Sequence, residues 1–251
     1  MGDLQTLFEP KATGGHDKGQ AAGYDACLGT KMMRRILEPE IMDDRAQVVA
    51  YAKADFSSSN QLFVDGLIET YHDRLGSILD LGCGPADVAI RLLRAVPSAK
   101  VTAVDASLPM VEIAREAVRK AGFQDHIDIV LGRLPGIDFG GLTFQTIASK
   151  DLLHHLPDPS VLWRGVVELA TGTTAIYVMD LYRPDSREEA KKIVEAVSGN
   201  EPDVLKRDFY DSLLAAFTVD EIQDQLGAAN LPLGVARVSE RHLLIHGLLP
   251  R

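Results

Sequence analysis

The chain has 251 residues, 46% of them hydrophobic, and a formal net charge of −10 at pH 7. This length suffices for one large domain or two small ones with a sizeable core. The acidic balance and the lack of a basic stripe argue against nucleic acid as a partner, because that binding depends on Lys and Arg contacts with phosphate. No apolar run is long enough to cross a bilayer, so we expect no membrane partner.

Cysteine usage points to a reducing compartment. The two cysteines are Cys27 and Cys83, and Cys83 lies inside a glycine turn, where a disulfide would obstruct ligand access. The sequence shows no basic-then-apolar N-terminal signal. We therefore expect a cytoplasmic protein.

The N-terminal third divides into two predicted parts. Residues 1–23 are rich in glycine and poor in large apolar side chains, which predicts a flexible segment. Residues 24–75 contain apolar positions at helical spacing over 32–37, 48–51 and 63–71. We interpret these helices as a cap over a ligand site; a helical layer that only covers the edge of a sheet is the alternative.

From residue 76 onward, strand and helix patterns alternate. This alternation predicts an α/β protein with a doubly wound parallel sheet and helices on both faces. The predicted strands are 77–81, 100–105, 126–131, 142–149 and 173–180, and the predicted helices are 86–96, 108–121 and 158–170.

The last part of the chain departs from the alternation. A helical insertion is expected at about 185–217, after the fifth strand. Thr218 and Glu221 form a capping-box pattern for a further helix. Apolar runs at 234–238 and 242–246 are compatible with an antiparallel hairpin at the sheet edge.

A glycine turn follows the first predicted strand. Gly82 and Gly84 are separated by one residue, and Pro85 follows at the start of a helical pattern. Glycine permits positive φ and lets a ligand approach the backbone, while proline suits a first helical turn. The pattern predicts a nucleotide-sized shelf at the carboxyl end of this strand.

Two acidic residues narrow the choice of ligand. Asp105 ends the next strand about 20 residues on, where dinucleotide-binding folds place a ribose-binding acid. Asp87 stands where the dinucleotide fingerprint has its third glycine, although a pyrophosphate needs an anion-friendly helix start. These residues favour a ligand with an amino or cationic group, and a non-catalytic NAD-type nucleotide-binding module remains an alternative.

Three motifs together resemble class I S-adenosylmethionine-dependent methyltransferases. They are Asp80-Leu81-Gly82-Cys83-Gly84, the strand-ending Asp105, and Leu152-Leu153-His154-His155-Leu156-Pro157-Asp158. The resemblance covers roughly residues 77–180 and the edge hairpin. It implies a Rossmann-like seven-stranded sheet whose last strand is antiparallel, and it makes residues 76–251 the S-adenosylmethionine-binding domain.

The resemblance also implies the placement of the cofactor S-adenosyl-L-methionine. The glycine turn would carry its methionine end, and Asp105 would accept from both ribose hydroxyls. The family often has Gly-Asp where this chain has Gly132-Arg133, so we expect backbone N–H groups of Arg133 and Leu134 to hold the adenine. The full set expected to bind the cofactor is Asn60, Asp80, Gly82, Cys83, Gly84, Asp105, Ala106, Ser107, Met110, Arg133, Leu134 and Ser149.

The histidine pair at the end of the fourth strand has two interpretations. His154 is a candidate general base, because histidine titrates near neutrality, but a structural role is the alternative. We expect no metal site, because the sequence places no Cys or carboxylate partners at ligand spacing from the pair.

The remaining candidates concern the methyl acceptor. Tyr182, Arg183, Arg207 and Tyr210 are interpreted as a clamp for a carboxylate or phosphate, with surface salt bridges as the alternative. Tyr51, with Tyr24 and Asn60, is expected to close over the methyl group; the alternative for the tyrosine rings is core packing.

The functional expectation is methyl transfer to a small-molecule acceptor, which carries a carboxylate or phosphate if the clamp exists. An RNA or protein methyltransferase is an alternative, but a basic face and an Asn/Asp-Pro-Pro-Tyr-type motif are missing from the sequence. A homodimer is compatible with the sequence. The acceptor atom cannot be read from it.

Overall fold

A computed structural model describes residues 33–39 and 41–250. Its centre is a seven-stranded sheet in the order β3-β2-β1-β4-β5-β7-β6. Strands β1 to β5 pair in parallel, and β7 runs antiparallel to both β5 and β6. The strands are β1 (Ser77–Leu81), β2 (Lys100–Asp105), β3 (Ile127–Leu131), β4 (Phe144–Lys150), β5 (Ala170–Leu181), β6 (Gly234–Arg237) and β7 (His242–Pro250).

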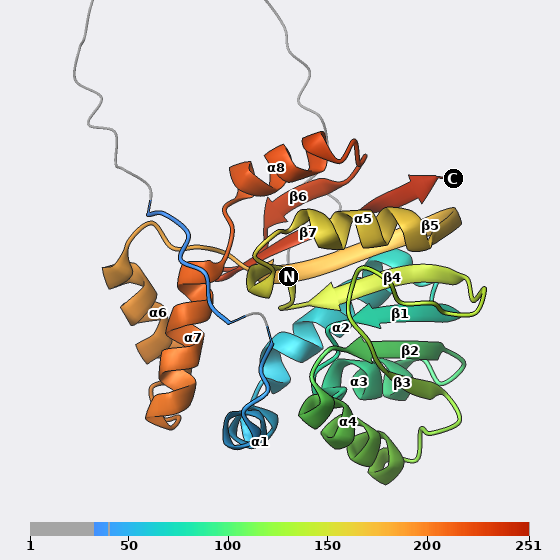
Figure 1. The fold of residues 1–251 in the computed structure, drawn as a ribbon, viewed down its shortest axis with the longest axis horizontal. Coiled ribbons are helices and arrows are strands. Elements are labelled where there is room, and N and C mark those ends of the chain that lie inside the picture. The colour runs from blue at the N-terminus through green and yellow to red at the C-terminus, as the bar shows by residue number, and fades with distance from the viewer. Residues whose placement is uncertain (1–32, 40, 251) are drawn as a thin grey trace, which may run out of the picture.

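Helices cover both faces of the sheet (Figure 1). On one face α2 (Ser57–Tyr71), α3 (Asp87–Ala95) and α4 (Leu108–Ala121) share a buried apolar cluster with β1 and β5. On the other face α5 (Ser160–Leu169) and α8 (Val219–Ala228) pack around the buried Trp163. The alternation of side chains along a strand sends Ile78 to the first cluster and Leu79 to the second, which is why both positions of β1 are apolar.

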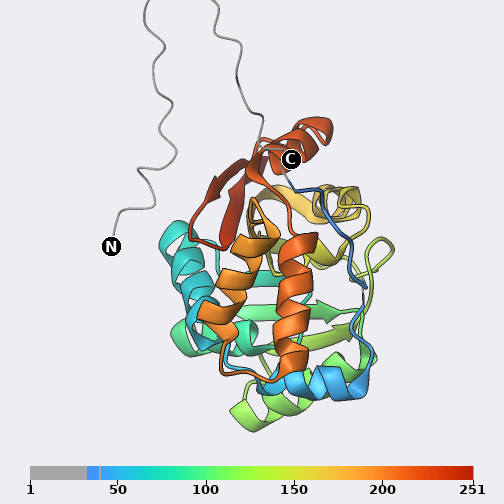
Figure 2. The same ribbon diagram turned by 90° about the vertical axis from the view of Figure 1, so that its left-hand side faces the viewer.

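A third group of helices lies beyond the carboxyl ends of the parallel strands. Helices α6 (Arg187–Ser198) and α7 (Asp203–Ala215) run side by side there, with α1 (Arg45–Lys53) beneath them (Figure 2). The apolar faces of α6 and α7 form a small separate core that includes Leu181 and Leu213. Helices α1, α6 and α8 begin at side-chain caps supplied by Asp44, Ser186 and Thr218, the last in a complete capping box.

The structure confirms the predicted α/β fold, including the antiparallel last strand and the capping box at Thr218. The predicted strand 77–81, strand 100–105 and helix 108–121 match β1, β2 and α4 at both ends. Residues 1–23, Tyr24 and Cys27 lie outside the described residues.

The helix predicted over 32–37 is wrong for its described part. Residues 33–39, called the strap below, are not helical, and their polar groups pair with distant segments instead. The Ile36 amide donates to the Leu214 carbonyl at 2.9 Å. The Arg35 guanidinium donates to the carbonyls of Ala215, His154 and Leu156. These tertiary hydrogen bonds outweigh the local helical pattern.

Helix α2 packs mainly on one face of the sheet. Its buried Phe63 meets the ring of Tyr177 on β5 edge-on, with ring centroids 5.2 Å apart. This helix therefore belongs to the layer on the sheet face, whereas the strap and α1 lie over the strand ends. No helix among residues 33–39 and 41–250 has the length and apolar character that a bilayer crossing requires.

The packing of α2 generates a stability prediction. Replacing Phe63, which is fully buried, by Ala is expected to lower the free energy of unfolding by about 3–5 kcal/mol, because the ring leaves a cavity. The neighbouring Leu62 is 48% exposed, so Leu62→Ala is expected to cost under about 0.5 kcal/mol. Urea denaturation of both variants measures the difference, and equal losses would contradict the assignment of α2 to the sheet layer.

Candidate active site

The glycine turn after β1 is anchored to β2. The amides of Gly82 and Cys83 both donate to the carbonyl of Val104 at 2.9 Å. Gly82 and Gly84 have positive φ values of 75° and 51°. A Cβ at Gly84 would meet nothing within 4 Å, so this residue faces open space where a ligand can approach the backbone.

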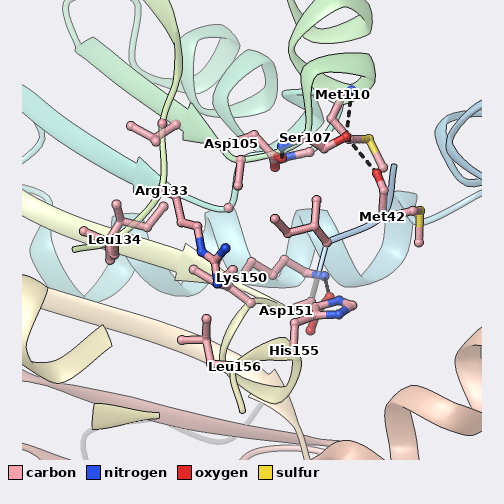
Figure 3. A pocket seen from close by; sticks show the side chains of 18 of the residues that line it. Met42, Asp105, Ser107, Met110, Arg133, Leu134, Lys150, Asp151, His155 and Leu156 are labelled. Carbon is pink, nitrogen blue, oxygen red and sulfur yellow. Dashed lines mark hydrogen bonds and ion pairs between the residues drawn. The ribbon is translucent and has the colours of Figure 1, made fainter. Parts of the chain in front are cut away.

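Asp105 joins the glycine turn to the turn after β2. Its carboxylate accepts from the Gly84 amide at 2.8 Å and from the Ser107 amide at 2.9 Å. Burial raises the pKa of Asp105 above its usual range despite these hydrogen bonds. Ser107 caps α4 and donates its hydroxyl to the Met42 carbonyl at 2.7 Å, which ties the segment before α1 to the site (Figure 3).

Three adjoining cavities open at the carboxyl ends of the strands. The first lies between β1, β2 and the loop after β3, the second lies on the α2–α3 side of the glycine turn, and the third lies under the strap, α6 and α7. Gly82, Gly84 and Lys150 line the first two cavities. Tyr51 and Asp151 line all three, so the cavities meet at these two residues.

The first cavity has apolar walls and polar ends. Met110 and Leu134 lie on opposite sides, and the Arg133 side chain extends across toward Lys150 (Figure 3). Leu134 rests on α5, where a Cβ added at Gly165 would come within 3.0 Å of its methyl groups. The shape suits a flat apolar ring with polar groups at its rim.

The second cavity is polar and holds an unpaired buried carboxyl group. Asp80 is 4% exposed, and its Oδ2 atom has no hydrogen-bond partner among the described residues. Burial, together with the nearby charge of Asp105, raises the pKa of Asp80 to about 7. In the same cavity the Asn60 amide and Arg91 both donate to Asp87, at 2.8 and 2.6 Å.

The junction of the cavities carries a charged pair that the sequence analysis missed. Asp151 follows β4 with a positive φ of 55°, and the Lys150 ammonium contacts its carboxylate. Burial opposes ionisation of Asp151, but the charges of Lys150 and His242 outweigh burial and lower its pKa to about 2. The available signal was the Lys-Asp sequence at the end of a predicted strand, since strand ends line the sites of parallel sheets.

The histidine pair lies in the short helix η2 (Leu153–His155) between the first and third cavities. His154 Nδ1 is 2.6 Å from the Asp180 carboxylate, while its Nε2 is 3.4 Å from Glu38 Oε1. Burial lowers the pKa of His154, but Asp180 and Glu38 raise it further, to about 9. For His155, burial and the charge of His154 lower the pKa to about 3.

Most of the expected cofactor-binding residues line these cavities. Ser149 is the exception: it is fully buried and donates its hydroxyl to the Leu81 carbonyl at 2.8 Å, so it joins β4 to β1 and does not line a cavity. The first cavity is lined by Gly82, Gly84, Asp105, Ala106, Ser107, Met110, Arg133 and Leu134, and the second by Asn60, Asp80, Gly82, Cys83 and Gly84.

The expected clamp for an anionic acceptor is not assembled. Arg183 is 3% exposed and donates to Glu221 at 2.6 Å, while Tyr182 packs beneath the guanidinium of Arg237. Arg207 is exposed on α7, and Tyr210 packs on the α6–α7 core. None of Tyr182, Arg183, Arg207 and Tyr210 lines any of the three cavities, because the partners of the first two lie on α8 and the sheet edge.

Residues 78–173 match a family model described as a methyltransferase domain. This match covers the glycine turn, Asp105 and the histidine pair, on a seven-stranded sheet whose last strand is antiparallel, as expected. The chain contains a class I S-adenosylmethionine-dependent methyltransferase domain.

Curated relatives of this methyltransferase domain match over part of their length. An uncharacterized methyltransferase of Mycobacterium tuberculosis (strain H37Rv) is 31% identical over 44% of this chain and 53% of its own. The 27-O-demethylrifamycin SV methyltransferase of Amycolatopsis mediterranei is 26% identical over 61% of this chain and 53% of its own. The chain spans about half of the length of each of these two relatives.

Solved structures share the fold at low identity. The plantazolicin methyltransferase BpumL, in complex with a desmethylPZN analog and SAH, matches with a TM-score of 0.64 and 14% identity, over 82% of this chain and 91% of its own. A SAM-dependent methyltransferase from Aquifex aeolicus gives a TM-score of 0.62 and 17% identity, over 82% of this chain and 99% of its own.

The buried Asp80 predicts a pH dependence of stability. The folded protein holds a proton on Asp80 that the unfolded chain releases near pH ~4, so the free energy of unfolding is expected to fall between pH ~4 and ~7. Asp80→Asn should remove this part of the decline. The free energy of unfolding of the variant should therefore increase relative to that of the wild type as the pH rises. Denaturation series at several pH values measure it, with the exposed Asp73→Asn as the control that keeps the wild-type profile.

Proposed function

We propose that this protein transfers a methyl group from S-adenosylmethionine to a small-molecule acceptor. The observation that carries the proposal is the meeting of three cavities at Tyr51 and Asp151. Methyl transfer from a sulfonium is a direct displacement, so the protein mainly positions the two reactants and excludes water. Two cavities for the cofactor and one for the acceptor, joined at one point, meet that requirement.

The cofactor fits the first two cavities by its chemistry. The adenine would lie between Met110 and Leu134, and the ribose hydroxyls would donate to the free lone pairs of Asp105. The amino acid part would enter the second cavity, where the unpaired carboxyl of Asp80 suits its ammonium group. The open space at Gly84 leaves room for the bound chain between the two ends.

The junction residues would surround the reacting methyl group. Burial and the nearby carboxylates of Asp151, Asp105 and Glu38 raise the pKa of Tyr51, so its phenol stays neutral and able to donate a hydrogen bond. The carboxylate of Asp151 would stabilise the positive sulfonium beside it. Neither group has to act as a base if the acceptor arrives ready to attack.

The third cavity would take the acceptor, and its charge argues against an anion. Arg241 is the one lysine or arginine among its described lining residues. A carboxylate- or phosphate-bearing acceptor, as the sequence suggested, therefore has no support from this geometry, and a neutral or positively charged acceptor is favoured. The carboxylates that line this cavity are Glu38, Asp55, Asp151, Glu201, Asp208 and Asp211.

Relatives with small-molecule names support this choice of acceptor class. They include the rifamycin-type methyltransferase above and a ubiquinone biosynthesis O-methyltransferase of Xanthomonas, which is 26% identical over 42% of this chain and 43% of its own. An RNA or protein acceptor has less support because the third cavity is acidic and is walled in part by α6 and α7. An NAD-type module is disfavoured by the carboxyl groups of Asp80 and Asp87 in the second cavity, which would repel a pyrophosphate.

A pair of glycine substitutions tests the cofactor site. Gly84→Ala and Gly122→Ala both place a side chain at positive φ in open space, so both are expected to lower the free energy of unfolding by about 1–2 kcal/mol. Only Gly84 lines a cofactor cavity, so only Gly84→Ala should weaken S-adenosylhomocysteine binding, by about tenfold or more. Calorimetry measures the affinities, and equal affinities of the two variants would exclude the glycine turn as the cofactor shelf.

Labelled methyl transfer tests the acceptor class. Protein supplied with methyl-labelled S-adenosylmethionine and cell extract is expected to label the small-molecule fraction, with neutral or cationic compounds carrying the label. Label in the RNA or protein fraction would support the macromolecular alternative instead. Binding of NAD without binding of S-adenosylhomocysteine would overturn the proposed cofactor.

A further inference from the structure

We propose that Glu38, His154 and His155 bind a divalent metal ion of the zinc type in the wall of the third cavity. These residues come from the strap and from η2, which lie far apart in the sequence. One ligand atom of each residue lies within 4.8 Å of the other two. Spacing in the sequence does not predict this site, because the carboxylate comes from a segment far upstream of the histidines.

The spacing of the three ligand atoms fits one central ion. Glu38 Oε1 lies 3.4 Å from His154 Nε2 and 3.2 Å from His155 Nδ1. Two ligands at about 2.0–2.1 Å from a tetrahedral zinc ion are separated by about 3.3 Å. Oxygen and imidazole nitrogen are also ligand types that zinc binds readily.

Two of the proposed ligand atoms are buried and make no hydrogen bond with the described residues. Within the part of the chain that the structure describes, neither Glu38 Oε1 nor His155 Nδ1 has a hydrogen-bond partner. The Glu38 side chain is only 8% exposed, so bulk water has little access to its unpaired oxygen. Buried oxygen and nitrogen atoms that converge on one point without hydrogen bonds are suited to binding a cation.

Neighbouring groups hold the proposed ligands in orientation. Asp180 binds Nδ1 of His154 at 2.6 Å and so directs its Nε2 toward Glu38, the usual arrangement of a carboxylate behind a metal-binding histidine. Ser212 donates to the second oxygen of Glu38 at 3.0 Å. Arg35 fixes the backbone of η2 by donating to the His154 carbonyl at 2.7 Å.

The site leaves a coordination position free. Three protein ligands and an open fourth position are typical of zinc sites that bind substrate, whereas structural sites use four protein ligands. All three proposed ligands line the third cavity, so the open position faces the space assigned to the acceptor. A role in holding an acceptor oxygen depends on the proposed function; metal binding itself does not.

A proton offers a competing explanation for the same geometry. A protonated His154 between Asp180 and Glu38 would satisfy the charges without any ion. His155 Nδ1 would still face Glu38 Oε1 at 3.2 Å without a well-oriented hydrogen bond, whereas one metal ion would bind both atoms, which is why the metal accounts for more of the arrangement.

Metal titration of the full chain separates the two explanations. Protein stripped with a chelator is titrated with Zn²⁺ in a calorimeter, and elemental analysis after gel filtration gives the stoichiometry. We expect one ion per chain. Glu38→Gln and His155→Asn should each weaken binding by more than about tenfold, since even loss of a supporting residue costs 10–100-fold. The exposed His72→Asn is the matched control and should bind as the wild type does.

Co²⁺ provides a second readout that does not depend on activity. Its visible absorption should report coordination of nitrogen and oxygen in the wild type and in His72→Asn, and should be lost in Glu38→Gln and His155→Asn. Absence of a bound ion in the wild type, or binding that both variants retain, would overturn the proposal. Calorimetry with S-adenosylhomocysteine on the same preparations shows whether they fold, and tests the cofactor site separately.

Discussion

The attachment of the glycine turn to β2 constrains the whole site. Two turn amides donate to one carbonyl, that of Val104, and the next amide donates to Asp105. The backbone that would carry the amino acid end of the cofactor and the carboxylate that would hold its ribose are therefore set by the same hydrogen bonds. Neither can shift without the other, so the two contacts keep a fixed separation.

Negative charge concentrated in a poorly solvated place explains the choice of cofactor. Asp80 and Asp105 lie close enough to repel each other, and Asp151 stays ionised beside Lys150. Burial makes this repulsion stronger than it would be in water. A cofactor with an ammonium and a sulfonium group relieves it, whereas a pyrophosphate would add to it. The electrostatics and the shape of the cavities thus favour the same ligand.

The sequence predicted what depends on local chemistry. Strands β1 and β2, helix α4 and the glycine turn follow from apolar runs that end at glycine, proline or a capping residue. Strand ends share one edge of a parallel sheet, which is why Asp80 and Asp105, both expected to bind the cofactor, line adjoining cavities.

Features that depend on tertiary contacts were missed. The strap has a helical pattern, but Arg35 and Ile36 bind carbonyls on η2 and around the end of α7 instead. Glu221, the partner of the buried Arg183, belongs to a capping box at the start of α8, and no spacing rule connects the two. Glu38 reaches the histidines only because the strap crosses them. Charges and ligands that meet across distant segments have no signature in a single sequence.

One consequence concerns the helix behind the first cavity. Leu134 is supported by the bare backbone of Gly165 on α5, where an added Cβ would lie 3.0 Å from the Leu134 methyl groups, a tight contact. Gly165 does not line the cavity, yet a larger residue there requires the Leu134 side chain, which does line it, to shift. The width of the first cavity thus depends on the size of a residue that lies behind its wall and does not contact the bound ring.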